Sequence, residues 1–235
     1  MANAASLDLE AGSSQYASDT TPNAALNTAG DLTVSCWIKI ESNPASGNFY
    51  SFGQTRDIVT TRHPWAFLLG NNAGTIELRL GHRNTSDQVE TAVVSWTPTL
   101  GVWYFVAVTA TGTTVKFYVG TQTASPVQQG SNQTLSFTRT TCADPDFYLG
   151  TTDGTAEYFD GLIDEFRFYD NDLTDFTYYN SEGTGNETNL QGYWKLNNDY
   201  TDSTTNDTDL TASGSPVFST DVPFTGSSGL QNKIW

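Results

Sequence analysis

The sequence has 235 residues, of which 10 are Lys or Arg and 26 are Asp or Glu, so its formal net charge is −16. A protein that binds nucleic acid needs clustered basic side chains to release counterions, so this composition excludes nucleic acid as a main partner. No segment approaches the roughly 18 consecutive apolar residues of a membrane-spanning helix, and we expect no membrane insertion. Only 15% of the residues are charged and 13% are aromatic, which favours strands and turns over long helices.

Alternation of apolar and polar side chains is clearest in residues 32–40 and is typical of a half-buried strand. The side chains on its predicted core face are Leu32, Val34, Cys36, Ile38 and Ile40. With two cysteines in the chain, a dense disulfide framework is excluded. We expect Cys36 to be a free buried thiol, and a Cys36–Cys142 bridge is the alternative.

Further short strands are predicted along the chain, each bounded by turn signals. They cover residues 75–80, 102–109, 113–120, 147–149, 162–169 and 192–196. The turn at Thr111-Gly112 joins two of them into a hairpin, and Thr174 is expected to cap one short helix over residues 175–180. The pattern predicts an all-β fold, a two-sheet antiparallel jelly-roll sandwich with at most one or two short helices.

We expect one sandwich domain over residues 1–189. Residues 190–224 are predicted to be a C-terminal extension packed on the same sandwich, because one strand and a hairpin cannot bury a core alone. Residues 225–235 are predicted to form a tail, whose terminal Trp235 indicates docking on a neighbouring subunit. The first six residues lack the basic and apolar regions of a signal peptide. We expect a location at a virion surface or in the extracellular space, with no signal peptide in this chain.

Four stretches of the chain carry a resemblance to known proteins: residues 6–12 (SLDLEAG), 32–39 (LTVSCWIK), 101–109 with 115–120, and 161–169 (GLIDEFRFY) with 173–174. In their order and spacing they resemble the laminin-G-like, concanavalin A-like lectin/glucanase domains of bacteria and phages. The resemblance implies a jelly-roll β-sandwich, recognition of sugars or cell surfaces, and a structural Ca²⁺. Trp37 and Trp103 match positions of that family that pack the sandwich.

Alternation places Asp164 on an apolar strand face, where a lone carboxylate is costly to bury unless it is paired or bound to a metal. The same face is predicted to carry Leu162, Phe166 and Phe168. The resemblance implies that this Asp ligates Ca²⁺ together with main-chain carbonyls of the opening strand. We therefore expect Asp164 to bind Ca²⁺, with the neighbourhood of Glu10 as the second contributor. The alternative is that Asp164 caps a backbone N–H or pairs with Arg167.

No catalytic constellation is found in the sequence. A glucanase of this fold needs two carboxylates on one strand face, in the string Glu-x-Asp-x-Glu, and that string is absent. Glu157 and Asp160 are three residues apart, which points them to opposite faces of a strand. The Asp-rich loop 199–209 lacks the glycine and the final glutamate of an EF-hand, so a solvated turn is favoured over a cation site. We therefore expect a protein that is not an enzyme.

The stretch from residue 54 to residue 83, about one eighth of the chain, holds four of the six arginines and both histidines. Sugar sites combine aromatic platforms with planar polar side chains. The predicted ligand-binding residues are Arg56, Arg62, His63, Trp65, Arg79, His82 and Arg83, with Trp65 as a platform in a loop. Such a positive island suits an acidic glycan. The alternative is that the arginines balance nearby carboxylates at a subunit contact and that Trp65 is a core-edge aromatic.

These features predict a non-catalytic, lectin-like module for recognition or adhesion, which binds a glycan or host-surface polysaccharide as part of a phage capsid decoration or tail fibre. One alternative is a purely structural assembly protein that binds no sugar. A second alternative is an accessory or catalytic domain of a secreted glycoside hydrolase. A virion role further predicts a homo-oligomer or contacts with other virion proteins.

Overall fold

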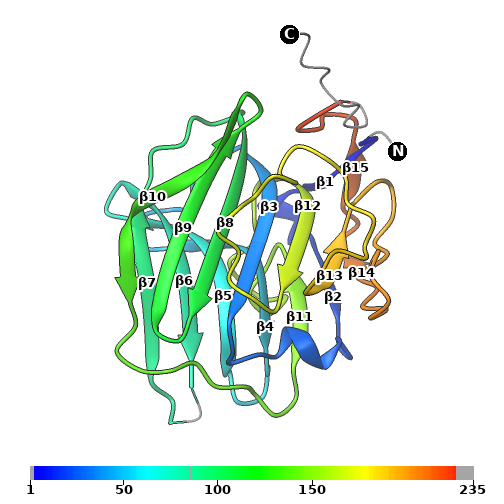
Figure 1. Cartoon of the computed structure of the whole chain (residues 1–235). Helices are drawn as coiled ribbons and strands as arrows, with labels where there is room; N and C mark the ends of the chain where they lie inside the picture. The colour runs from blue at the N-terminus through cyan, green and yellow to red at the C-terminus, as the bar shows by residue number, and fades with distance from the viewer. Residues whose placement is uncertain (1–2, 85, 226–235) are drawn as a thin grey trace, which may run out of the picture.

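A computed structural model describes residues 3–84 and 86–225 of the chain. Its strands form two antiparallel sheets that pack face to face, so the predicted sandwich is confirmed (Figure 1). Two single-turn 3-10 helices, η1 (Ala11–Ser13) and η2 (Ala24–Leu26), occur among the described residues. None of the described helices has the length and apolar character that crossing a bilayer requires.

One sheet has eight strands, in the spatial order β10-β9-β8-β3-β12-β1-β15, with β13 also paired to β12. Their bounds are β1 (Ser6–Leu9), β3 (Leu32–Ile40), β8 (Trp103–Thr111), β9 (Thr114–Thr121), β10 (Ala124–Thr134), β12 (Gly161–Tyr169), β13 (Leu190–Trp194) and β15 (Val217–Ser219). The predicted hairpin is confirmed as β8 and β9. The polar strand β10, which is mostly exposed at the sheet edge, gave no alternating signal in the sequence.

The other sheet has seven strands, in the order β14-β2-β11-β4-β5-β6-β7. Their bounds are β2 (Tyr16–Asp19), β4 (Phe49–Arg56), β5 (His63–Asn72), β6 (Thr75–Arg83), β7 (Val89–Ser95), β11 (Asp146–Leu149) and β14 (Thr211–Ser213). Most of the residues from 54 to 83 therefore lie on three adjacent strands, β4, β5 and β6.

Residues 190–224 contribute strands to both sheets. β13 pairs with β12 and β15 pairs with β1 in the eight-stranded sheet, whereas β14 pairs with β2 in the seven-stranded sheet. Trp194 of β13 is fully buried among the core residues. Residues 226–235 of the predicted tail, including Trp235, lie outside the described residues, so the docking of that tail stays a prediction.

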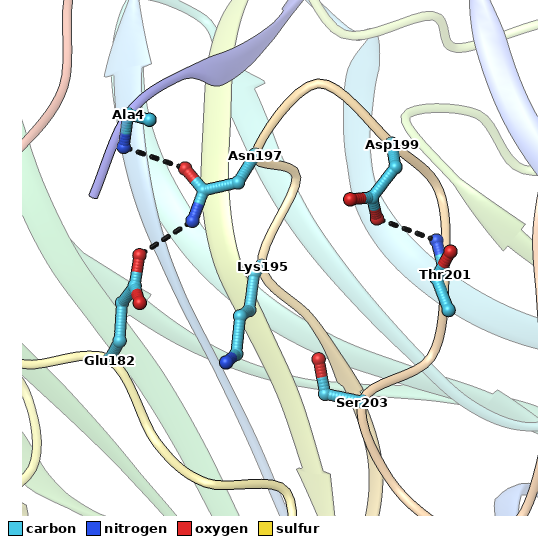
Figure 2. A pocket seen from close by; sticks show the side chains of 7 residues that line it. All are labelled: Ala4, Glu182, Lys195, Asn197, Asp199, Thr201 and Ser203. Carbon is cyan, nitrogen blue, oxygen red and sulfur yellow. Dashed lines mark hydrogen bonds between the residues drawn. The ribbon is translucent and has the colours of Figure 1, made fainter. Parts of the chain in front are cut away.

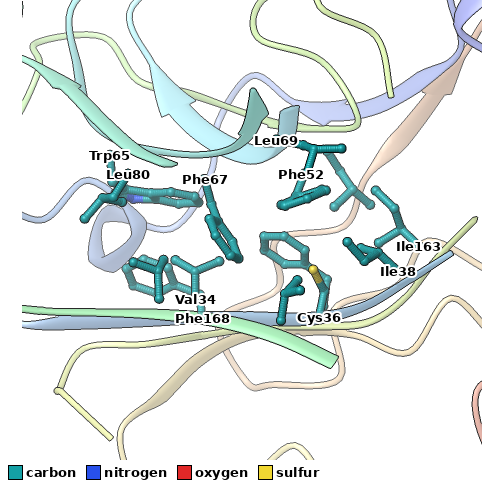
Figure 3. Packing of buried hydrophobic residues seen from close by; sticks show 14 of the residues in the cluster. Val34, Cys36, Ile38, Phe52, Trp65, Phe67, Leu69, Leu80, Ile163 and Phe168 are labelled. Atoms are coloured by element: carbon teal, nitrogen blue, oxygen red, sulfur yellow. The ribbon is translucent and has the colours of Figure 1, made fainter. Parts of the chain in front are cut away.

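The core fills the space between the two sheets (Figure 3). Val34, Cys36 and Ile38 project from β3 toward Phe52 and Phe67 of the opposite sheet. The predicted core face of residues 32–40 is thereby confirmed, because all five of its side chains are fully buried. Both cysteines are buried and free, as expected.

A β-bulge interrupts β12 between Asp164 and Arg167, and Glu165 adopts the left-handed conformation with φ 53°. The extra residue shifts the alternation of the strand. Ile163, Phe166 and Phe168 therefore face the core between the sheets, whereas Leu162 packs in a second cluster on the outer face. The predicted grouping of Asp164 with Leu162, Phe166 and Phe168 on one face is wrong for this reason.

The second cluster covers the outer face of the eight-stranded sheet and includes Trp37 and Trp103. Both tryptophans are buried packing residues, as expected, but they lie on the outer face of the sheet instead of between the sheets: Trp37 stacks on Tyr179, and Trp103 donates its Nε1–H to Asp221. The helix predicted over residues 175–180 is wrong. Phe176, Tyr178 and Tyr179 are all packed inward by tight turns, a spacing that does not fit one helix face.

A buried ion pair lies in the same outer layer. Arg167 donates to Glu165 Oε2 over 2.6 Å, and its guanidinium lies between the rings of Tyr178 and Tyr193, 4.6 and 4.5 Å from their centroids. Tyr193 also donates its hydroxyl to Glu165 Oε2. The charged pair thus has polar partners and two aromatic faces in place of water.

Candidate functional site

A cleft of about 260 Å³ opens on the outer face of the seven-stranded sheet, and we call it the sheet cleft. Alternation along β5 directs Trp65, Phe67 and Leu69 into the core, so Ala66 and Leu68 face outward and form part of the cleft. The residues that line it are Phe49, Gln54, Arg56, His63, Ala66, Leu68, Arg79, Gly81, Val89, Thr91, Thr152 and Glu157. Three of the predicted ligand-binding residues, Arg56, His63 and Arg79, are brought together here.

The Gln54 side chain is the most deeply buried polar group of the sheet cleft. Its residue is 1% exposed, and its Nε2 has no hydrogen-bond partner among the described residues. Arg56 Nε, on the same face of β4, is also buried without a partner. Because buried donors in folded proteins are nearly always paired, these two groups leave unused hydrogen-bonding capacity at the cleft.

Gly70 allows Arg79 to lie across β5. A Cβ atom at Gly70 would overlap Arg79 Nε and fall 2.9 Å from its Cδ, so only glycine leaves that path free. The Arg79 guanidinium reaches the ring of Phe49, with Cζ 4.6 Å from the ring centroid, and Nε donates to Glu77 Oε2 over 2.9 Å. Arg79 is therefore fixed in position before any ligand arrives.

His63 supplies a neutral imidazole. Burial, helped by the positive charges of Arg56 and Arg83, lowers its pKa to about 4. Nδ1 lies 3.3 Å from the carbonyl oxygen of Thr61. Because that oxygen accepts only, the neutral ring carries its proton on Nδ1 and leaves Nε2 as an acceptor.

Glu157 enters the cleft from the loop between β11 and β12. It has φ 57°, and its carbonyl oxygen accepts a hydrogen bond from Ser51 N of β4 over 3.1 Å. Burial raises the pKa of its carboxyl group, whereas a hydrogen bond from Thr152 and the charge of Arg56 oppose the rise. A left-handed conformation costs a non-glycine residue roughly 1–2 kcal/mol, so the surrounding contacts hold Glu157 in place.

The predicted positive island is neutralised by ion pairs. Each of its four arginines lies near a carboxylate: Arg56 at 3.4 Å from Asp153, Arg62 at 3.3 Å and Arg83 at 3.7 Å from Asp87, and Arg79 beside Glu77. Arg62 and Arg83 do not line the sheet cleft. This arrangement agrees with the alternative in which the arginines balance nearby carboxylates.

Trp65 and His82 are not surface residues, so their prediction as ligand contacts is wrong. Trp65 is 0% exposed, donates its Nε1–H to the carbonyl oxygen of Leu26 and stacks on Phe168 at 5.2 Å between centroids. It belongs to β5, not to a loop. His82 is also 0% exposed, because alternation along β6 turns it inward against Phe137.

Asp164 and Glu10 do not form one calcium site. Leu9 pairs with Gly161, so Glu10 lies opposite residue 160. Asp164 is four residues farther along that strand, which corresponds to about 13 Å. Asp164 is fully buried and accepts hydrogen bonds from Asn3 Nδ2 and Glu165 N. Glu10 is exposed beside Asp8 and Glu41, with ligand oxygens within 4.8 Å of one another. The capping alternative for Asp164 therefore fits the observed contacts.

A larger pocket of about 430 Å³ lies between the N-terminal segment and residues 195–203 (Figure 2). Several of its polar groups bond to one another: Asn197 accepts from Ala4 N and donates to Glu182, and Asp199 accepts from Thr201 N. No aromatic ring is among the described residues that line it. The sheet cleft, with unpartnered donors and an aromatic wall, is better suited to a sugar. The carboxylates of Asp199, Asp202 and Asp209 accept backbone N–H groups within their own loop.

Sequence reasoning missed Gln54, Glu157 and Phe49. Gln54 carries no charge, so nothing in its residue type distinguished it from other polar strand residues. Glu157 lies far from β4 in the sequence and reaches the cleft only because β11 pairs with β4. Phe49 lies seven positions before Arg56, an odd spacing that predicts opposite faces of a strand, and only the bulge between Ser51 and Gly53 brings both residues to the cleft.

Comparisons with known proteins agree with this fold. A family model described as the concanavalin A-like lectin/glucanases superfamily matches residues 11–176. No curated protein sequence matches the chain. A putative carbohydrate binding protein from Bacteroides ovatus has a TM-score of 0.62 at 15% identity, over 95% of this chain and 62% of that one. A heptameric SAP-like pentraxin from Limulus polyphemus has a TM-score of 0.59 at 12% identity, over 92% and 94%.

Tailspike protein 2 from a bacteriophage of Escherichia coli O157:H7 has a TM-score of 0.53 at 14% identity, over 74% of this chain and 25% of that one. At these identities the solved structures establish a shared jelly-roll architecture. The family model covers well over half of the 235 residues. The chain therefore belongs to the concanavalin A-like lectin/glucanase superfamily.

Proposed function

We propose that this protein is a non-catalytic glycan-binding module and that the sheet cleft is its binding site. The buried Gln54 amide, whose Nε2 has no partner in the described structure, is the feature that most requires a ligand. An unpaired buried donor costs about 1–3 kcal/mol, and a sugar hydroxyl that accepts from the Gln54 amide, once that amide turns toward the cleft, removes the cost. Gln54 therefore favours a ligand rich in hydroxyl groups.

The other groups of the sheet cleft complement a sugar. Arg56 and Arg79 add planar donors, and His63 Nε2 and the Glu157 carboxyl group add acceptors for hydroxyl protons. The outward-facing Leu68 and the Phe49 ring offer apolar surface to the C–H face of a pyranose. The cleft thus presents both kinds of surface that a sugar ring has.

The ion pairs favour a neutral glycan over an acidic one. Arg56 and Arg79 are already paired with Asp153 and Glu77, so an anionic sugar would have to compete with a carboxylate for each guanidinium. A neutral sugar needs only hydrogen bonds from the remaining N–H groups. We therefore expect binding that changes little between low and high salt.

The carboxylate content of the sheet cleft supports a non-catalytic role. Glycoside hydrolysis requires two carboxyl groups on either side of the scissile bond. Glu157 is the single carboxylate among the described residues that line the cleft. Incubation of the purified protein with the bound glycan should yield no new reducing ends; their steady appearance would contradict this part of the proposal.

The binding proposal is tested by a glycan array followed by titration calorimetry with the best ligand. Arg79→Ala should weaken binding about tenfold or more, because it removes a charged donor that lines the cleft. Arg62→Ala is the matched control, since Arg62 pairs with Asp87 outside the cleft lining. Equal affinity in both variants, or no glycan bound by the folded protein, would refute the proposal.

We further propose that glycan recognition serves adhesion at a virion or extracellular surface. Support comes from the acidic composition, which suits a solvated exterior, and from the fold shared with a phage tailspike protein. The fluorescently labelled protein should sediment with host cells, and the free glycan should release it. Sedimentation that the free glycan does not reduce would contradict glycan-mediated adhesion.

A further inference from the structure

A second cavity adjoins the sheet cleft. It measures about 410 Å³ and lies where the loop before β4 approaches the loop between β11 and β12. Its lining residues are Ala11, Ala45, Asn48, Phe49, Tyr50, Ala156, Glu157 and Tyr158. Phe49 and Glu157 line both cavities, so these two residues form the boundary between them.

The two cavities differ in chemistry. The sheet cleft contains the arginine, histidine and glutamine side chains, whereas the second cavity has three partly exposed aromatic rings, those of Phe49, Tyr50 and Tyr158. Asn48 is the exposed polar side chain beside them. Aromatic surface with an adjacent amide suits a sugar ring that stacks on one face and keeps hydroxyls at its rim.

The rings of the second cavity are held in place. The Tyr158 hydroxyl donates to the carbonyl oxygen of Gly154 over 2.5 Å, and the Tyr50 hydroxyl lies 3.1 Å from Ser42 Oγ. Tyr50 also packs edge-on against Phe159, with 6.1 Å between the ring centroids. Rings fixed before binding lose little conformational entropy when a ligand stacks on them.

The boundary residues are fixed as well. Arg79 covers the Phe49 ring, and Ser51 N holds the carbonyl oxygen of Glu157. The Glu157 side chain borders both cavities, so it can accept hydroxyl protons from ligand atoms on either side. Two adjoining cavities that share the Glu157 acceptor and the Phe49 ring fit consecutive units of an oligosaccharide better than a single isolated sugar.

We propose that the ligand is a neutral oligosaccharide whose consecutive sugar units lie across Phe49 and Glu157, one in the sheet cleft and the next in the second cavity. This inference rests on the proposed function and adds the length of the ligand. Affinity then increases with the number of sugar units until both cavities are occupied, and the second cavity contributes through stacking.

Titration calorimetry with a length series of the glycan selected on the array tests the inference. The wild-type protein should bind the disaccharide or trisaccharide about tenfold more tightly than the monosaccharide, from one added stacked ring. Tyr158→Ala should abolish this gain and leave monosaccharide affinity unchanged. Tyr158→Phe, which keeps the ring, should retain most of the gain.

Ala45→Trp gives an independent result if Tyr158→Ala impairs folding. Ala45 is exposed and lines the second cavity, so a tryptophan there fills the cavity at the surface of the protein. It should remove the gain with length and not the binding of the monosaccharide. Equal affinity for all lengths in the wild type, or a gain that persists in Ala45→Trp, would overturn the inference. Failure of every sugar to bind would instead refute the proposed function.

Discussion

Replacing Gly70 by Ala tests whether the position of Arg79 matters for binding. The new Cβ would overlap Arg79 Nε and lie 2.9 Å from Cδ and 3.0 Å from Cζ. All three are atoms of one flexible side chain, so Arg79 can move while the backbone of β5 stays in place. The guanidinium then leaves the Phe49 ring and Glu77.

The expected effect on stability is a modest loss. Alanine gains roughly 0.5–1 kcal/mol over glycine within a strand. Loss of the cation–π contact costs roughly 0.5–1 kcal/mol, so these two effects nearly cancel. The Glu77 carboxylate is mostly buried, so losing its hydrogen-bonded partner costs about 1–3 kcal/mol, and the free energy of unfolding should fall by about that amount. A misplaced charged donor should cost about 1.5–3 kcal/mol of binding, which is about 10- to 150-fold in affinity.

Titration calorimetry with the selected glycan measures the affinity, and urea unfolding measures the stability. Gly12→Ala is the matched control, because a Cβ there meets no atom within 4 Å and Gly12 lines neither cavity. Wild-type affinity in Gly70→Ala would refute the role assigned to Arg79. A stability loss well beyond about 3 kcal/mol would refute the claim that only the side chain moves.

Three further predictions concern residues of the core and of the site. Trp65→Phe should lower the free energy of unfolding by about 1–3 kcal/mol, because the buried Leu26 carbonyl loses its hydrogen-bond donor. The same variant should bind the glycan with unchanged affinity, and reduced affinity in the folded variant would contradict the burial of Trp65. The pKa of His63 falls from 6.5 to about 4 on folding, so between those values the unfolded chain takes up a proton that the folded chain does not, and stability falls as the pH falls. His63→Gln should flatten that part of the curve in urea unfolding at a series of pH values, and an unchanged slope would disprove the linkage. Arg167→Met should cost about 3–5 kcal/mol, because the buried Glu165 carboxyl group loses its cationic partner and keeps only the Tyr193 hydroxyl. The double variant with Glu165→Gln should recover much of that loss in the same assay, and equal losses in both variants would argue against this reasoning.

Strand alternation predicted the fold where a strand runs without interruption. In β3 every second side chain faces the core, so the apolar pattern of residues 32–40 identified both the strand and its buried face. In β12 the same reasoning failed, because the bulge near Glu165 shifts the alternation and nothing in the residue types marks it. Asp164 was therefore grouped with Phe166 and Phe168, which face the core on the other side of the sheet.

The site was predictable to the extent that its residues are close in sequence. Arg56, His63 and Arg79 come from adjacent strands, so clustering in the sequence predicted their proximity. The inward direction of Trp65 was also readable, since it alternates in step with Phe67 and Leu69. Glu157 was not predictable in this way, because the pairing of β11 with β4 brings its loop to the cleft.

Chemical-shift mapping of the side-chain resonances with the selected glycan tests the location of the site most directly. We predict that the Gln54 side-chain amide and the His63 ring shift most as the glycan is added, because both groups line the sheet cleft. Shifts confined to the Trp37 and Trp103 indoles, on the outer face of the other sheet, would contradict the assignment.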